Sequence, residues 1–216
     1  AAGDGIPAGG PIGAPVIIYD EVTLDADFIN VYSTTIESTG KLFIGDAFGT
    51  YLGNVSGTGT INIESGVLPA VNYDNFFICG GGSMEYDGSV DYTISSIPTQ
   101  YQNLSLLGSG VRTIPFQFID ICGDMLIDGP EFNNDPNKAP FNFYGNLELR
   151  SGTFNSTKGF ALYNFTGSSL QYIIGDFTDE SSIRVLQINN NVEITGDVEV
   201  SRNLDLYGGN LITSST

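Results

Sequence analysis

The sequence predicts an all-β fold, a right-handed parallel β-helix built of short stacked coils. Apolar residues occupy every second position in short segments, most clearly in residues 83–94 and 101–114. Gly, Ser and Asn interrupt these segments every five to eight residues, and the same pattern returns in residues 191–213. This rhythm leaves no room for helices and is typical of β-solenoids, in which each repeat forms one coil.

The apolar segments begin at Val16 and continue along the chain. At roughly 20 residues per coil, the chain holds about ten coils. Residues two apart on a strand share a face, so the apolar partners of each segment are expected to point inward. The predicted inward pairs are Ile61 and Ile63, Leu104 and Leu106, Leu147 and Leu149, Val192 and Ile194, Val198 and Val200, and Leu204 and Leu206. The segment Phe76-Phe77-Ile78 is predicted to be a further strand.

The alternative fold is one β-sandwich or two. Strands in sandwiches usually recur every 8–12 residues. Many intervals here are shorter, and the strands near the C-terminus have only four or five residues. The spacing therefore favours the solenoid.

The predicted domain organisation rests on where Gly and Pro are concentrated along the chain. Residues 1–15 are rich in Gly, Pro and Ala, which predicts a flexible or extended leader. Residues 16–216 form the predicted solenoid. Residues 128–140 contain three prolines, and because proline donates no backbone hydrogen bond, a Pro-rich loop is expected there. The strand-like residues just before Thr216 indicate that the chain is a fragment of a longer one.

The composition excludes several classes of function. Seven basic residues face 25 acidic ones, giving a net charge of −18, which argues against binding nucleic acid. The chain has no His, which removes Ser-His-Asp catalysis and the usual zinc sites. No apolar run is long enough to span a membrane, so no membrane insertion is expected. The two cysteines, Cys79 and Cys122, are interpreted either as buried thiols or as a disulfide between stacked coils.

The middle of the chain is similar to repeats in large secreted surface proteins of Bacteroidetes-type bacteria. The matching segments are Gly81–Gly88, Tyr92–Ile94, Tyr101–Leu106 and Gly108–Ile114, with Arg112 where Lys is usual. Residues 203–211 are similar to the rungs of the same proteins. The resemblance implies an adhesin-like β-helix, secreted or held at the cell surface, that is often exported by the type IX pathway and is associated in such bacteria with gliding motility and cell adhesion. It brings no catalytic motif.

Calcium is the ion that the acidic turns suit best, because it prefers oxygen ligands from Asp, Asn and backbone carbonyls. The candidate ligands are Asp87 and Asp91 in one turn and Asp135 in another. No other cofactor is expected.

Two further groups of residues are candidate sites for carbohydrate. Carboxylate pairs for sugar hydrolysis could come from Asp120 with Asp124, from Asp176 with Asp179 and Glu180, or from Glu193 with Asp197 and Glu199. A solvated acidic face is the simpler interpretation of all three. Exposed aromatic residues for sugar contact are expected at 141–144, after the Pro-rich loop. The basic residues are scattered in sequence, which argues against a polysaccharide lyase.

The sequence therefore predicts a structural, adhesive module rather than an enzyme. Its expected partners are proteins of the cell surface or of a secretion assembly, or glycans. Two alternatives stay open: a carbohydrate-active β-helix enzyme, and a protein-binding subunit of a surface assembly. Three or more acidic groups in one cleft would favour the enzyme, ladders of Asn or Thr the adhesin, and a broad apolar patch the subunit.

Overall fold

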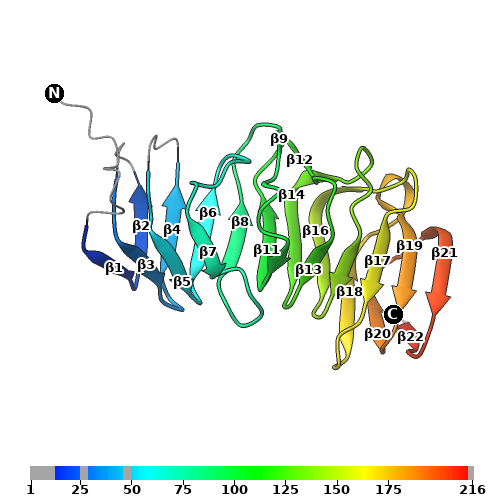
Figure 1. Cartoon of the computed structure of the whole chain (residues 1–216). Helices are drawn as coiled ribbons and strands as arrows, with labels where there is room; N and C mark the ends of the chain where they lie inside the picture. Colours follow the sequence, from blue (N-terminus) through cyan, green and yellow to red (C-terminus); the bar gives the residue numbers. More distant parts are fainter. Residues whose placement is uncertain (1–12, 25–28, 46–49, 214–216) are drawn as a thin grey trace.

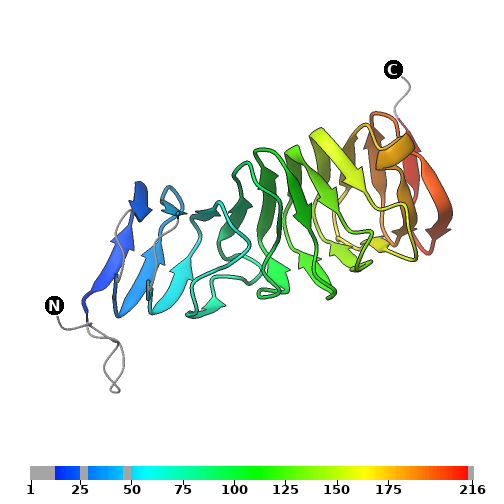
Figure 2. The same cartoon turned by 90° about the horizontal axis from the view of Figure 1, so that it is seen from above.

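The computed structural model describes residues 13–24, 29–45 and 50–213. The protein is all-β, with 52 % of the described residues in strands, and its strands stack as a β-solenoid of about nine turns. Figures 1 and 2 show the coils following one another along a single axis, from the first strands in blue to the last in red. Every pairing between the described strands is parallel, which confirms the solenoid and excludes the sandwich, since sandwich sheets are antiparallel. The predicted leader lies almost wholly outside the described residues, and the first strand begins at Pro15.

One face of the solenoid is made of two successive sheets. The first has four strands: β1 (Pro15–Ile18), β3 (Ser33–Ile36), β5 (Asn54–Gly57) and β7 (Asn72–Asn75). The second has six strands: β10 (Gln100–Tyr101), β13 (Ile119–Ile121), β15 (Phe141–Phe143), β17 (Leu162–Phe165), β19 (Ile183–Ile188) and β21 (Val200–Leu206). Each coil contributes one strand to this face.

The second face is a continuous parallel sheet, and each coil contributes one strand to it. Its strands in order are β2 (Glu21–Leu24), β4 (Lys41–Ile44), β6 (Thr60–Ile63), β8 (Ser83–Tyr86), β11 (Asn103–Leu107), β14 (Met125–Asn133), β16 (Leu147–Asn155), β18 (Gln171–Gly175), β20 (Val192–Thr195) and β22 (Leu211–Thr213).

A short third face forms in the middle of the rod. It begins with β9 (Tyr92–Thr93) and β12 (Val111–Thr113), and it continues in the second halves of β14 and β16, which bend around the corner. After β18 its place is taken by a loop that contains the 3₁₀ turn η1 (Asp179–Ser181). This face carries the polar clefts described below.

The prediction of a loop over residues 128–140 is wrong for its first half. The last residues of β14, from Asp128 to Asn133, belong to the sheet and pair with β16. The register shifts on both sides of Asp128, so Pro130 lies at the bend, where a missing backbone donor does no harm to the ladder. The actual loop is confined to residues 134–140.

Glycines make the bend after the second face possible. Gly108 and Gly129 both have positive φ, at 77° and 113°, a region that other residues rarely adopt. A side chain at Gly108 would collide with the carbonyl oxygen of Gly88 in the preceding coil, and one at Gly129 would collide with that of Gly108. Close stacking of these coils at the corner therefore requires glycine at positions 108 and 129.

The core is a ladder of apolar side chains stacked coil upon coil. Leu104, for example, is fully buried between Met84 and Met125. Burying one such side chain stabilises the fold by about 1.5–3 kcal/mol. The ladder consists of Leu42, Ile61, Met84, Leu104, Met125, Leu147, Ile173 and Ile194.

Most predicted inward pairs are confirmed, with one exception. Leu204 and Leu206 on β21 are 44 % and 53 % exposed, because β21 is covered by a neighbouring coil on one side only within the described residues. The predicted strand at Phe76–Ile78 is also wrong: these residues form turns after β7, and Phe76 packs edge-to-face on Phe77. A run of three apolar residues is therefore as compatible with a turn packed on the core as with a strand.

Candidate functional site

The turn after β8 holds two of the predicted calcium ligands. One oxygen of Asp87 accepts a hydrogen bond from the backbone N–H of Gly88 at 2.7 Å. An oxygen of Asp91 accepts one from the N–H of Val111 in the next coil at 2.8 Å. Both carboxylates thus order the turn and its contact with the neighbouring coil, as Asp residues in turns commonly do.

The backbone carbonyls of this turn accept hydrogen bonds from the buried guanidinium of Arg112. The guanidinium of Arg112 is fully buried and donates to the carbonyl oxygens of Asp87, Gly88 and Val90, at 2.8–3.0 Å. It also donates to the carbonyl of Leu107, at 2.9 Å. Carbonyl oxygens that could have coordinated calcium therefore point at the arginine.

The third predicted ligand, Asp135, lies elsewhere. It follows β14, two strands along the second face from β8, and is 8 % exposed. One of its oxygens accepts from the backbone N–H of Lys158 at 2.7 Å, and the other lies 3.6 Å from the Lys158 ammonium. In the part of the chain that the structure describes, no three acidic or cysteine side chains gather as a metal-binding group. Calcium binding at Asp87, Asp91 and Asp135 stays a prediction.

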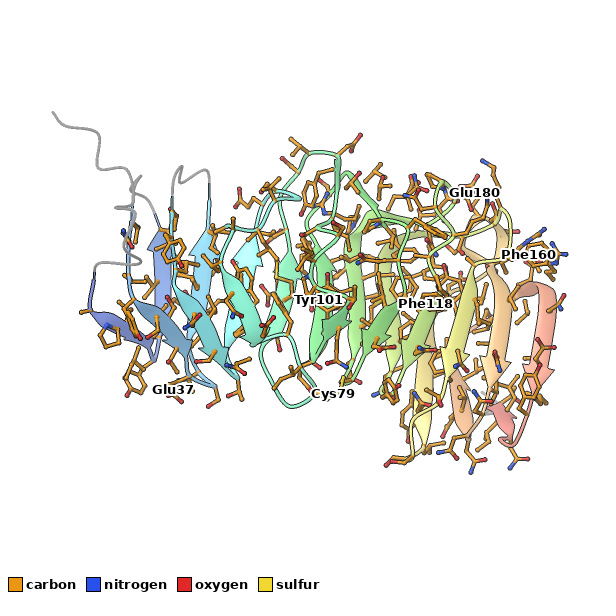
Figure 3. The ribbon with its side chains drawn as sticks, in the orientation of Figure 1. Glu37, Cys79, Tyr101, Phe118, Phe160 and Glu180 are labelled. Carbon is orange, nitrogen blue, oxygen red and sulfur yellow. A yellow bond between two sulfur atoms is a disulfide. The ribbon has the colours of Figure 1, made fainter. Side chains whose placement is uncertain are left out.

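Two polar clefts adjoin on the third face, beside η1. The larger, of about 740 Å³, is lined by Arg150, Asp176, Asp179 and Glu180 among others. The smaller, of about 340 Å³, is lined by Glu131, Asp135 and Glu180 and shares Glu180 with the first. Figure 3 shows Glu180 on this side of the rod. The structure thus brings Asp176, Asp179 and Glu180 to one cleft, as predicted for a carboxylate cluster.

Part of the acidic lining is committed to structural hydrogen bonds. Glu131 accepts from the Asn155 side chain at 3.0 Å, and Asp176 accepts from the Thr178 hydroxyl at 2.6 Å. Of the other predicted pairs, Asp120 accepts from the Asn142 side chain and Asp124 from the backbone N–H of Asn146, both at 2.8 Å. Asp120 and Asp124 therefore tie coils together.

A ladder of side-chain amides runs along the outside of β13, β15 and β17. Asn142 donates to Asp120 at 2.8 Å, Asn164 donates to Asn142 at 3.0 Å, and Asn189 donates to Asn164 at 2.6 Å. The partners are separated by 22, 22 and 25 residues, which is one coil in each case. A ladder of outward-facing Asn side chains is the feature expected of an adhesin.

The prediction of exposed aromatic side chains at 141–144 is confirmed only for Tyr144. Phe141 and Phe143 are buried in the core, and only Tyr144 of that segment is exposed, at 45 %. Phe118, which directly precedes β13, is 73 % exposed. Phe160, two residues before β17, is 66 % exposed. Figure 3 labels both.

Four basic residues converge on the turn before β17, and we call this cluster the basic corner: Lys138, Lys158, Arg184 and Arg202. The Arg184 Nε donates to the carbonyl of Gly159 at 3.2 Å, and the Arg202 guanidinium carbon lies 3.6 Å from the centroid of the Phe160 ring. The alkyl chain of Lys138 covers Gly159, where a side chain would collide with it.

The basic corner is not predicted from the sequence, in which these four residues are scattered. Their spacing along the chain is close to one coil, so the fold places them side by side. Arg184 and Arg202 come together through a bulge: Ile183 pairs with Val200 and Val185 with Asn203, leaving both Ser201 and Arg202 opposite Arg184. Basic residues at coil spacing would have been the signal.

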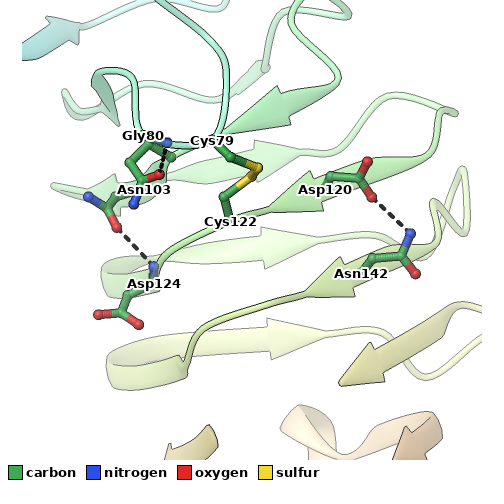
Figure 4. The surroundings of a disulfide bond; sticks show 8 residues. Cys79, Gly80, Asn103, Asp120, Cys122, Asp124 and Asn142 are labelled. Carbon is green, nitrogen blue, oxygen red and sulfur yellow. Dashed lines mark hydrogen bonds between the residues drawn. A yellow bond between two sulfur atoms is a disulfide. The ribbon is translucent and has the colours of Figure 1, made fainter. Parts of the chain in front are cut away.

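The cysteines form a disulfide between two coils that are not neighbours (Figure 4). Cys79 lies in the loop after β7 and Cys122 directly follows β13, with Cα atoms 5.3 Å apart. The strand of the intervening coil on this face is β10. The loop is further held by the backbone N–H of Gly80, which donates to the Gln102 side chain of that coil at 2.6 Å.

Comparisons of the chain with family models, curated proteins and solved structures find no match. Among the described residues, no helix is long and apolar enough to cross a membrane.

Proposed function

We propose that the chain is a non-catalytic, structural and adhesive module of a bacterial protein that is secreted or held at the cell surface. The amide ladder from Asp120 to Asn189 is the observation that carries the proposal. The ladder lies on the outer face, so its side chains take no part in the hydrophobic core. Its hydrogen bonds join each coil to the next and stiffen this face. A regular polar face on a rigid rod suits repeated contacts with another surface.

The disulfide supports the extracellular part of the proposal. Disulfides persist in secreted and surface proteins and are rare in reducing compartments. Cys79 and Cys122 join two coils that are each hydrogen-bonded at Gln102 to the coil between them, so the bond adds durability to a preformed stack. The net charge of −18 keeps free rods apart at low salt.

The proposed partners are surface or secretion-assembly proteins, or glycans. Calcium is proposed as an ion that relieves the repulsion between acidic rods. Its proposed ligands are Asp87, Asp91 and Asp135. The type IX pathway, with gliding or adhesion as the setting, is carried only by the resemblance of residues 81–114 to surface proteins.

A second candidate function is a carbohydrate-active enzyme. The observation that favours it is the smaller polar cleft, where Glu131, Asp135 and Glu180 line one cavity. Glycoside hydrolysis needs two carboxylates facing each other across the sugar. The structural bonds of Glu131 and Asp135 argue for the non-catalytic interpretation.

A glycan-degradation screen, run beside light scattering with calcium and with chelator, tests the proposal. We expect no turnover of any glycan, and larger particles in millimolar calcium than in chelator. Turnover that disappears in a Glu131→Gln, Glu180→Gln or Asp197→Asn variant would replace the module with the enzyme. Scattering that is indifferent to calcium would remove only the calcium component.

A further inference from the structure

The basic corner concentrates positive charge that the protein leaves unpaired. Of its four cations, only Lys158 has a described carboxylate within 4 Å, that of Asp135. Lys138, Arg184 and Arg202 form no ion pair with any described residue. Like charges on neighbouring coils repel one another, and an anion between them would relieve the repulsion.

The chain treats its other cations differently. Lys41 pairs with Glu85 at 2.6 Å, and Arg150 pairs with both Glu148 and Asp128. Arg112 is buried among carbonyl oxygens. In a chain with 25 acidic residues, four of seven basic ones thus gather at one place, and three of these four lack an acidic partner.

Exposed phenyl rings lie along the same corner of the rod. Phe160 lies beside the basic corner and is 66 % exposed, although Arg202 covers one side of its ring. Phe118 directly precedes β13, two coils earlier, and the register of β13, β15 and β17 places it opposite Leu162, two residues after Phe160. Apolar side chains that gather at an exposed site rimmed by polar residues are typical of binding surfaces.

We propose that the basic corner binds an anionic polysaccharide, one that carries uronate or sulfate groups. This rests on the proposed adhesive function and names its ligand class. The cations lie on successive coils, about 4.8 Å apart along the rod, which is close to the length of one sugar unit in an extended chain. A linear polymer with one charge per unit or per two units can follow such a row.

The side chains present suit both parts of such a ligand. The guanidinium groups of Arg184 and Arg202 can each donate two parallel hydrogen bonds to a carboxylate or sulfate. The rings of Phe118 and Phe160 offer flat apolar surfaces to the C–H faces of sugar rings. An acidic peptide would satisfy the cations but offers no comparable flat face to the rings.

Binding to polygalacturonate, dextran sulfate, neutral dextran and poly-glutamate is the test, measured by affinity electrophoresis and calorimetry with the whole chain. We expect the chain to bind the two anionic polysaccharides and not neutral dextran. The affinity should fall several-fold from low to physiological salt, because exposed charges are screened. The double variant Arg184→Gln/Arg202→Gln should lose about tenfold in affinity, and Phe160→Ala should weaken binding to the polysaccharides only.

The matched control is Lys41→Gln/Arg150→Gln, which removes the same charge from elsewhere, with circular dichroism to verify folding of both variants. Equal losses in the two double variants would overturn the proposal, as would an absence of binding by the unaltered chain. Equally tight binding to poly-glutamate would replace the polysaccharide with an acidic protein. Glycan turnover in the screen above would instead overturn the non-catalytic function, so the two failures are distinct.

Discussion

The guanidinium carbon of Arg112 lies 4.3 Å from the centroid of the Tyr92 ring, inside the solenoid. The same guanidinium holds four backbone carbonyls, three from the turn after β8 and one from the end of β11. Two neighbouring coils are thereby joined at their corner by one side chain. Hydrogen bonds to these carbonyls compensate the guanidinium for the water that it loses on burial.

Arg112→Lys should destabilise the fold although it preserves the charge. A lysine ammonium is a single donor atom and cannot span the four carbonyls that the planar guanidinium reaches. Buried carbonyls left without a donor should lower the free energy of unfolding by about 2–4 kcal/mol. Urea denaturation measures this. Arg150→Lys, on the exposed surface, is the control and should leave the midpoint unchanged; equal effects would contradict the role of Arg112.

Alkaline pH should destabilise the protein through its buried tyrosines. Burial raises the pKa of Tyr73, Tyr86, Tyr101 and Tyr163, and it raises that of Tyr92 to about 12. Below about pH 10, the ordinary tyrosine pKa, both folded and unfolded chains keep these protons, and stability is unaffected. Above it the unfolded chain loses protons that the folded one retains, so stability falls as pH rises.

Tyrosinate absorbance followed together with far-ultraviolet circular dichroism measures this effect. The buried tyrosines should ionise only together with the loss of β-structure. Complete tyrosine ionisation in a chain that keeps its native dichroism would show that the hydroxyls are accessible.

Leu104→Asp and Ser105→Asp should have opposite outcomes. Leu104 is fully buried in the core ladder, and a charge there should cost about 4 kcal/mol or more and unfold or fragment the stack. Ser105 points outward from the same strand and should tolerate the change within about 1 kcal/mol. Thermal melting compares them; similar midpoints would mean that the register of β11 is wrong.

Replacing both cysteines by serine should lower stability by about 4 kcal/mol on the loop-entropy estimate. The bond closes a loop of 43 residues, and cutting it frees the unfolded chain. Denaturation with and without a reductant provides the measurement, and the double variant should be indifferent to the reductant. A reductant effect that persists in the double variant would point to another cause.

The coils could be predicted from the sequence because the alternation of apolar residues is a local property. Ile61 and Ile63 or Leu147 and Leu149 point inward whatever their neighbours are, since a strand reverses its faces at each residue. Pro130 misled the prediction, because a bend inside a strand accepts proline as readily as a loop does.

The surface features could not be predicted in the same way. They depend on which coils become neighbours, and the coil length varies: partners in the amide ladder are 22 to 25 residues apart. Cys79 and Cys122 pair because a loop reaches past one coil. Arg184 meets Arg202 only because a bulge shifts the register of β21.

The link between Cys79 and Cys122 has a mechanical consequence. A pull on one end of a stack of parallel coils peels them off one after another, since each is held mainly by its two neighbours. At this covalent tie the tension passes directly from Cys79 to Cys122, and the 42 residues between them carry none. A single molecule stretched under oxidising conditions should therefore fall short of its full contour length by that segment, and it should recover the missing length when the bond is reduced.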